Sequence, residues 1–278
     1  MSQSQAVWQP EFRGPALSAS SAVSAMAVAA WGVIVLAALV FIGITGSAFL
    51  PLVLVGGITL VLAVAMPLFG LCVFLGTLPI SNLGPAAQQV FSLGRAAGIV
   101  LAVAVLPQVL LRGWRMRGGR NPAFIAALVL LAMALGSVLW SRYPTVSLSY
   151  AATLAQFALL ILLMATVIRD GADLMWGLRA YVIGCLAAAV LPFVLGVSVE
   201  AQRVTVTAAG TEINPNNYGV LLSLGLLTCL YLFRADGSRA VKALCIAGML
   251  MLPVVLFLTG SRATVVAIGL AILLQAVR

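Results

Sequence analysis

The sequence predicts an all-α fold, a polytopic transmembrane bundle of about ten α-helices. The first reason is its composition. Hydrophobic residues make up 63% of the 278 positions and charged residues only 8%, whereas a soluble domain carries roughly 25% charged residues. One crossing of the hydrocarbon needs about 20 apolar residues, and with its turn it uses roughly 25 to 30. The length therefore accommodates about ten crossings.

The second reason is the pattern within the apolar runs. Residues 123–139 and 221–232 are apolar on all sides, whereas a strand of a membrane barrel alternates between apolar and polar positions. This pattern favours helices over strands.

The predicted elements follow in order along the chain. Residues 1–21 lack hydrophobicity and periodicity and are expected to form a disordered cytoplasmic tail, and residues 22–278 one transmembrane domain. The segment 22–44 exceeds the roughly 7–15-residue core of a cleavable signal, so we expect it to remain as the first span. Segments 48–65 and 67–80 are short and contain proline, which predicts tilted, broken or re-entrant helices. Further spans are expected near 96–111, 122–140, 146–168, 174–196, 218–233, 243–258 and 263–277.

The third reason is the distribution of positive charge. A basic cluster follows the fourth predicted span and fixes that loop as cytoplasmic under the positive-inside rule; it contains Arg112, Arg115, Arg117 and Arg120. Alternating from this loop leaves only four of the 15 Lys and Arg residues outside, namely Arg95, Arg142, Arg203 and Arg262. The net charge of +9 is therefore explained by membrane topology, and no nucleic-acid partner is expected.

Metal and cofactor chemistry has little support in the sequence. The chain has no histidine, which is the commonest metal ligand and neutral-pH base. All four cysteines fall inside predicted spans and are interpreted as small packing residues; they are Cys72, Cys185, Cys229 and Cys245. We expect neither a metal nor a cofactor.

The outer arginines are candidate ligands of an anion. A guanidinium stays ionised and fits a phosphate group bidentately. If Arg142, Arg203 and Arg262 come together, they would form an outward-facing anion site, for which a pyrophosphate is the obvious multivalent ligand at a membrane surface. Arg262 also begins a predicted span, where a helix N-terminus favours an anion. Interfacial arginines equally snorkel to lipid head groups or cap carbonyls, so the pattern leaves both interpretations open.

An ordered set of motifs surrounds these arginines. Ten residues separate Arg203 from the run Asn214-Pro215-Asn216-Asn217, in which proline suits a first helical turn and asparagine a cap. An apolar span, a basic inner loop and another span then lead to Thr259-Gly260-Ser261-Arg262. This order and spacing resemble the O-antigen ligase and polysaccharide polymerase family of bacterial envelopes, closely over 203–275 and elsewhere only in hydropathy.

The resemblance implies a multi-pass protein of the bacterial inner membrane with a cytoplasmic N-terminus. Its activity would be glycan transfer from an undecaprenyl-pyrophosphate carrier to an acceptor sugar at the periplasmic face, without nucleotide or metal. Its partners would be the lipid bilayer, the lipid-linked donor and a glycan or lipid-core acceptor. Arg203 and Arg262, with Arg142, would hold the pyrophosphate, and the supporting motif residues would be Asn214, Pro215, Asn216 and Ser261.

The sequence departs from the family in one respect. The family carries a large periplasmic loop with a histidine after the span that follows the Ser-Arg element, whereas this sequence ends at Arg278. We therefore expect either the N-terminal portion of such an enzyme or a chain that acts with a second one. No catalytic residue is identified, although Glu200 and Glu212 of the outer loop 197–214 are candidate bases. The alternative is a non-catalytic transporter or a membrane protein that binds the lipid carrier.

Overall fold

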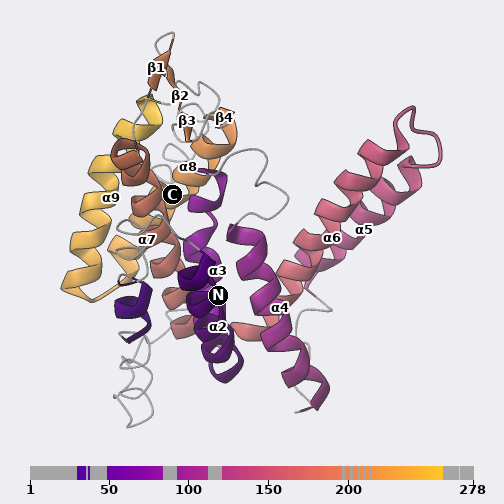
Figure 1. The fold of residues 1–278 in the computed structure, drawn as a ribbon, viewed down its shortest axis with the longest axis horizontal. Coiled ribbons are helices and arrows are strands. Elements are labelled where there is room, and N and C mark those ends of the chain that lie inside the picture. Colours follow the sequence, from indigo (N-terminus) through magenta and orange to yellow (C-terminus); the bar gives the residue numbers. More distant parts are fainter. Residues whose placement is uncertain are drawn as a thin grey trace, which may run out of the picture. The chain divides into compact units, whose positions relative to one another are not determined.

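The computed structural model describes residues 30–35, 37, 49–83, 93–111, 121–195, 198–200, 203–205, 207–208, 211–212, 215–258 and 269 (Figure 1). The chain divides into two compact units, Met1–Ile58 and Thr59–Arg278. The predicted tail 1–21 and most of the predicted first and last spans lie outside the described residues.

Helices make up most of the described chain. In order they are α2 (Phe49–Ala65), α3 (Pro67–Thr77), the 3₁₀ helix η1 (Ile80–Leu83), α4 (Leu93–Leu111), α5 (Pro122–Ser137), α6 (Pro144–Val167), α7 (Gly171–Leu195), α8 (Pro215–Ala235) and α9 (Arg239–Leu258). The prediction of a helical membrane protein is confirmed in this coarse form.

Four of the described helices are long and apolar enough to cross a membrane. They cover Pro144–Val167, Gly171–Leu191, Asn216–Ala235 and Arg239–Leu258. Shorter apolar helices occupy Val53–Ala65, Pro67–Thr77, Gly94–Val109 and Pro122–Ser137. The number of about ten spans thus stays a prediction, because several predicted segments form helices shorter than the roughly 20 residues that a full crossing requires.

The predicted break between the second and third segments is confirmed. Met66 is non-helical between α2 and α3, with φ −134° and ψ 85°, and Pro67 occupies the first turn of α3. Proline has no N–H to continue the α2 hydrogen-bond ladder, so the helix ends before it. The Met66 N–H still bonds to the Leu62 carbonyl at 2.7 Å.

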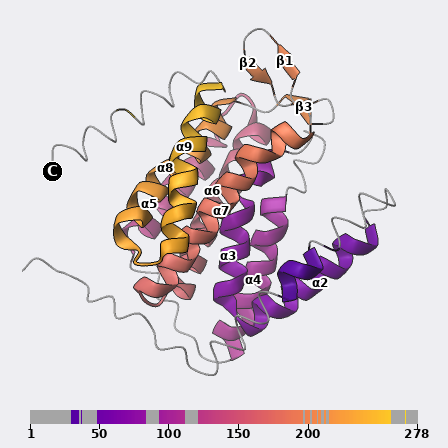
Figure 2. The same ribbon diagram turned by 90° about the vertical axis from the view of Figure 1, so that its left-hand side faces the viewer.

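Helices α7, α8 and α9 form an antiparallel core in which neighbours alternate in direction (Figures 1 and 2). At one end, Arg179 of α7 binds Asp236, which follows α8 directly. Toward the other end, the Tyr218 hydroxyl donates to the Ala188 carbonyl at 2.6 Å. These contacts place the turn at 236–238 with the beginning of α7, as strict alternation predicts.

Helices α3 and α4 extend the same alternation. Gly98 of α4 lies against Phe74 of α3, and Gly70 of α3 against Leu101 of α4, so the two helices are antiparallel. In contrast, α3 runs parallel to α7, because Gly76 meets Gly184 while Pro67 lies near the beginning of α7. This agrees with the predicted order, in which the third and seventh spans cross in the same direction.

Small residues allow the core helices to approach closely. A Cβ on Gly225 of α8 would lie 2.5 Å from the Cys185 sulfur of α7, and one on Gly248 of α9 would lie 2.6 Å from the Cys229 sulfur of α8. These two cysteines and Cys245 are fully buried, which confirms their interpretation as packing residues. Small residues at such interfaces are typical of membrane helices.

The α5–α6 hairpin presents most of its apolar surface outward. No residue of α5 is buried among the described residues, and Leu128, Val129 and Met133 are each more than 40% exposed. In α6, burial becomes dense only near the C-terminal end, where Leu163 and Val167 pack against α3 and α4. Apolar side chains on the remaining surface are appropriate for contact with lipid.

The predicted outer loop contains short strands that the all-α prediction did not include. Strand β1 (Ser198–Glu200) pairs with β2 (Arg203–Thr205), and β3 (Thr207–Ala208) with β4 (Thr211–Glu212), each antiparallel. Valine and threonine dominate this segment, and β-branched residues favour strands. The β1–β2 register places Glu200 opposite Arg203.

Candidate functional site

The predicted outer anion site is only partly covered by the described residues. Asn214, Ser261 and Arg262 lie outside them. The backbone of Arg203 begins β2, at the turn of its hairpin. The described part of the chain therefore does not test whether these residues assemble.

Arg142 lies in the turn between α5 and α6 and is exposed. Beside it, Ser141 Oγ accepts the Tyr143 N–H at 3.1 Å and the Ser147 hydroxyl at 2.7 Å, which shapes the start of α6. No hydrogen bond or ion pair joins Arg142 to another described residue. Whether Arg142 meets Arg203 and Arg262 therefore stays a prediction.

The motif around Asn214 agrees with the structure where it is described. Pro215 is the first residue of α8, as its proline chemistry predicts, and Asn216 is exposed in the first turn. Because α8 and α9 are antiparallel, Pro215 and Leu258 lie at the same end of the pair. Their neighbours in sequence are Asn214 and Thr259, the first residues of the two motifs.

A buried ion pair at the opposite end of this core was not predicted. Arg179 Nη2 lies 2.6 Å from Asp236 Oδ2, and Arg179 Nε donates to the same oxygen at 2.8 Å. The Asp236 side chain is only 3% exposed, and its other oxygen accepts the Ser238 N–H at 2.9 Å. The Arg179 guanidinium also lies over the Trp176 ring, 4.8 Å from its centroid.

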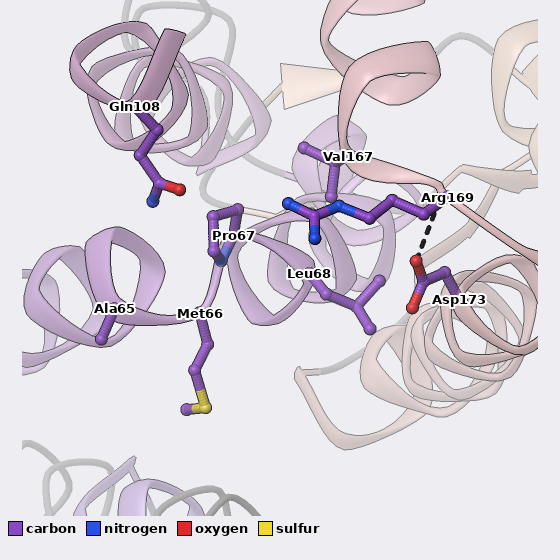
Figure 3. Close-up of a pocket in the computed structure, with 8 residues that line it drawn as sticks. All are labelled: Ala65, Met66, Pro67, Leu68, Gln108, Val167, Arg169 and Asp173. Carbon is purple, nitrogen blue, oxygen red and sulfur yellow. Dashed lines mark hydrogen bonds between the residues drawn. The ribbon is translucent and has the colours of Figure 1, made fainter. Parts of the chain in front are cut away.

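The break between α2 and α3 opens a cavity of about 350 Å³. It lies near the beginning of α7, where the chain returns from α6. Figure 3 shows the side chains around it. They belong to Ala65, Met66, Pro67, Leu68, Gln108, Val167, Arg169 and Asp173. This cavity was not predicted, although the sequence contains two signals for it: a glutamine inside an apolar helix, Gln108, and the Met66-Pro67 break.

Gln108 provides a hydrogen bond to the end of α2 at this break. Its Nε2 donates to the Val64 carbonyl at 2.7 Å, an acceptor that the proline break leaves without its helical N–H. A carbonyl can only accept, so the amide nitrogen faces Val64 and Oε1 faces the cavity, as in Figure 3. Gln108 is 5% exposed, and no described residue donates to its Oε1.

The beginning of α7 supplies the charged part of the lining. Asp170 Oδ1 accepts the Asp173 N–H at 2.9 Å as an N-cap, and Asp173 Oδ2 accepts the Arg169 N–H at 2.9 Å. This reciprocal arrangement resembles a capping box. Figure 3 shows the Arg169 guanidinium extending away from the Asp173 carboxylate toward Pro67, and these two charged groups form no ion pair with each other.

Within the described residues, no group of three or more His, Cys, Asp and Glu residues is arranged to hold a metal ion. No family model, curated protein or solved structure matches the chain. The functional assignment therefore depends on the sequence motifs and on the geometry of the described helices.

Proposed function

We propose that this chain is an integral membrane glycan ligase or polymerase of the bacterial inner membrane. It would cross the membrane about ten times with its N-terminus in the cytoplasm. It would transfer a glycan from an undecaprenyl-pyrophosphate carrier to an acceptor sugar at the periplasmic face. The observation that carries the proposal is the α8–α9 pair, whose ends at Pro215 and Leu258 lie together and continue directly into the two motifs.

The hairpin segment supports the same location for Arg203. It joins the end of α7 at Leu195 to the beginning of α8 at Pro215, and both ends lie away from the Arg179–Asp236 pair. In the proposed reaction, Arg203 and Arg262 stabilise the negative charge that develops on the departing pyrophosphate. Arg142, on the α5–α6 turn, is the third candidate.

The test is glycan transfer by the purified chain in lipid nanodiscs with a lipid-linked donor. Removing one preorganised hydrogen-bond donor that stabilises developing negative charge typically lowers kcat by about 10²–10³-fold. We therefore expect the rate of glycan transfer by Arg203→Ala and by Arg262→Ala to fall about 10²–10³-fold below that of the unmutated chain. Arg234→Ala is the matched control, because Arg234 is exposed in the last turn of α8, at the other end of the helix. Equal transfer by all four proteins would exclude the two arginines from the reaction.

Orientation can be tested separately from activity. Single cysteines replacing Tyr143, Val204 and Thr264 should react with a membrane-impermeant maleimide from the periplasmic side. A cysteine replacing Ser238, in the exposed α8–α9 turn, should react only after the membrane is opened. The opposite labelling pattern would place the motif arginines in the cytoplasm and remove the proposed site.

A non-catalytic transporter or carrier-binding protein is the second candidate. A base is expected for activation of the acceptor hydroxyl, and the 278 residues contain no histidine, so that Glu200 and Glu212 are the candidate bases; this alternative needs no base at all. Binding of the lipid-linked donor that depends on Arg203 and Arg262, without any transferred product, would favour this alternative over the enzyme.

A further inference from the structure

Two tyrosine hydroxyls join α7 and α8, one in each direction. Tyr218 of α8 donates to the Ala188 carbonyl of α7 at 2.6 Å. Tyr181 of α7 donates to the Leu221 carbonyl of α8 at 2.9 Å. The two helices are therefore tied together at two levels, and the Tyr218 bond is the one nearer to the end that continues into the loop 196–214.

The Ala188 carbonyl depends on a donor from outside α7. In an α-helix, a carbonyl accepts the N–H of the residue four positions later, and that residue is Pro192, which has no N–H. Ala188 and Ala189 are fully buried, and a buried carbonyl without a donor costs free energy. Membrane helices tolerate such a proline where a neighbouring helix satisfies the carbonyl that it frees. The Tyr218 hydroxyl supplies this donor.

The Leu221 carbonyl does not depend on its tyrosine in the same way. The residue four positions later is Gly225, which has an N–H and lies within the continuous helix α8. The bond from Tyr181 is thus an addition to a helical hydrogen bond. Tyr181 is also only partly buried, whereas Tyr218 is 2% exposed. The two tyrosines form bonds of the same kind between the same helices, but only one of them replaces a missing helical donor.

The position of Tyr218 connects this bond to the outer motifs. Tyr218 follows the run Asn214–Asn217 directly and lies in the first turn of α8, which begins at Pro215. The other partner, Ala188, lies in the last two turns of α7, which ends at Leu195. The Tyr218–Ala188 bond therefore joins the two helix ends between which the loop with β1, β2, β3 and β4 is held.

We propose that Tyr218 is a positioning residue of the outer site. By tying the first turn of α8 to α7, its hydroxyl fixes the Asn214–Asn217 run and both ends of the loop that carries Arg203. This inference rests on the proposed function for the reaction that the site performs, and it adds a residue that acts through others. A misplacement of about 1 Å in a reacting site can lower a rate by about 10²-fold, so a single hydrogen bond at the base of the loop is sufficient for a large effect.

The first test compares Tyr218→Phe with Tyr181→Phe in the nanodisc transfer assay. Each variant loses one hydroxyl and keeps the ring, and kcat is expressed per folded protein, so that a loss of stability alone does not lower it. We expect Tyr218→Phe to lower kcat at least about tenfold and Tyr181→Phe to retain most of it. An unchanged kcat in Tyr218→Phe, or an equal loss in Tyr181→Phe, would overturn the proposal.

The second test measures the loop itself, by hydrogen–deuterium exchange at the amides of residues 198–212 in the purified full-length chain. Loss of one hydrogen bond shifts a local opening equilibrium by a factor of about 5. We therefore expect exchange in this segment to become about fivefold faster in Tyr218→Phe and to stay unchanged in Tyr181→Phe. Unchanged exchange in Tyr218→Phe would overturn the proposal.

A substitution at Pro192 separates positioning from the mere satisfaction of a carbonyl. Pro192→Ala returns a helical N–H to the Ala188 carbonyl, but it does not tie α8 to α7. In the Pro192→Ala background, Tyr218→Phe should therefore cause little loss of thermal stability and should still accelerate exchange in 198–212. If Tyr218→Phe has no effect on exchange in this background, the hydroxyl only satisfies the carbonyl and the proposal is wrong.

The failure of this inference can be distinguished from the failure of the proposed function. If Arg203→Ala and Arg262→Ala lose transfer while Tyr218→Phe keeps it, only the positioning role is refuted. If the unmutated chain transfers no glycan, the proposed function fails, and the exchange measurement still decides whether Tyr218 holds the loop.

Discussion

The Arg179–Asp236 ion pair offers the most direct test of the core packing. It joins residues 57 positions apart in the sequence and connects α7 to the turn between α8 and α9. Asp236 receives two charge-assisted contacts from the guanidinium, at 2.6 and 2.8 Å. The carboxylate is 3% exposed and the arginine side chain 24% exposed, so solvent screens only the arginine to any extent.

The magnitude follows from what each substitution leaves behind. Arg179→Met leaves a buried carboxylate with the Ser238 N–H as its described donor, and breaking a buried pair on one side costs about 3–5 kcal/mol. We take about 3 kcal/mol because Arg179 is partly solvated. Asp236→Asn keeps an acceptor for Ser238 and costs about 1–2 kcal/mol. The double variant Arg179→Met/Asp236→Asn leaves no unpaired charge, so the destabilisation that it causes should be smaller than the sum of the two single effects. We expect a coupling energy between the two substitutions of about 2 kcal/mol.

The assay is reversible unfolding of the purified protein in mixed micelles with increasing SDS, followed by circular dichroism. Arg234→Met is the matched control, because this exposed arginine lies at the same end, and it should change stability by less than about 0.5 kcal/mol. A coupling energy below about 0.5 kcal/mol would refute the reasoning, because it would mean that the pair contributes no more than an exposed one.

Three further predictions concern the helix contacts. Gly184→Ala should destabilise the protein by about 1–3 kcal/mol, because the new Cβ meets the Gly76 carbonyl. Its control is Gly57→Ala, which has no atom of another described element within 4 Å of its Cβ position and should stabilise the protein by up to about 1 kcal/mol. The same unfolding assay compares the two variants, and equal effects on stability would exclude close packing at Gly184. Tyr218→Phe removes the donor to Ala188 and should cost about 1 kcal/mol, and an unchanged midpoint would show that this bond contributes nothing. The third prediction concerns the buried thiols of Cys185, Cys229 and Cys245. In native detergent micelles, a bulky maleimide should label these three thiols only after unfolding, and their rapid labelling in the folded protein would contradict their burial.

Features governed by local chemistry could be predicted from the sequence. Pro67 ends one helix and begins the next, and Pro215 begins α8, because proline lacks an N–H and fixes its own φ angle. The relative directions of α3, α4, α7, α8 and α9 also agree with the alternation that the basic cluster defines. The burial of Cys185, Cys229 and Cys245 follows from their positions within apolar runs, whereas Cys72 is only partly buried.

Features that depend on distant partners could not be predicted. Gln108 and Val64 are 44 positions apart, and their bond exists only because α2 ends beside α4. Similarly, Asp236 is one acidic residue in a basic loop of the sequence, and only the fold shows that it forms an ion pair with Arg179. The strands at 198–212 were missed because hydropathy distinguishes spans from loops and does not detect short β pairing.

The Gly–Cys contacts on α8 have a consequence for how this core can move. Gly225 receives a sulfur from α7, and Cys229, one turn further along α8, inserts its own sulfur against Gly248 of α9. A shift of α8 along its axis by one turn would carry both contacts onto larger side chains at once. We therefore expect α8 to resist sliding along its axis more strongly than tilting about this level.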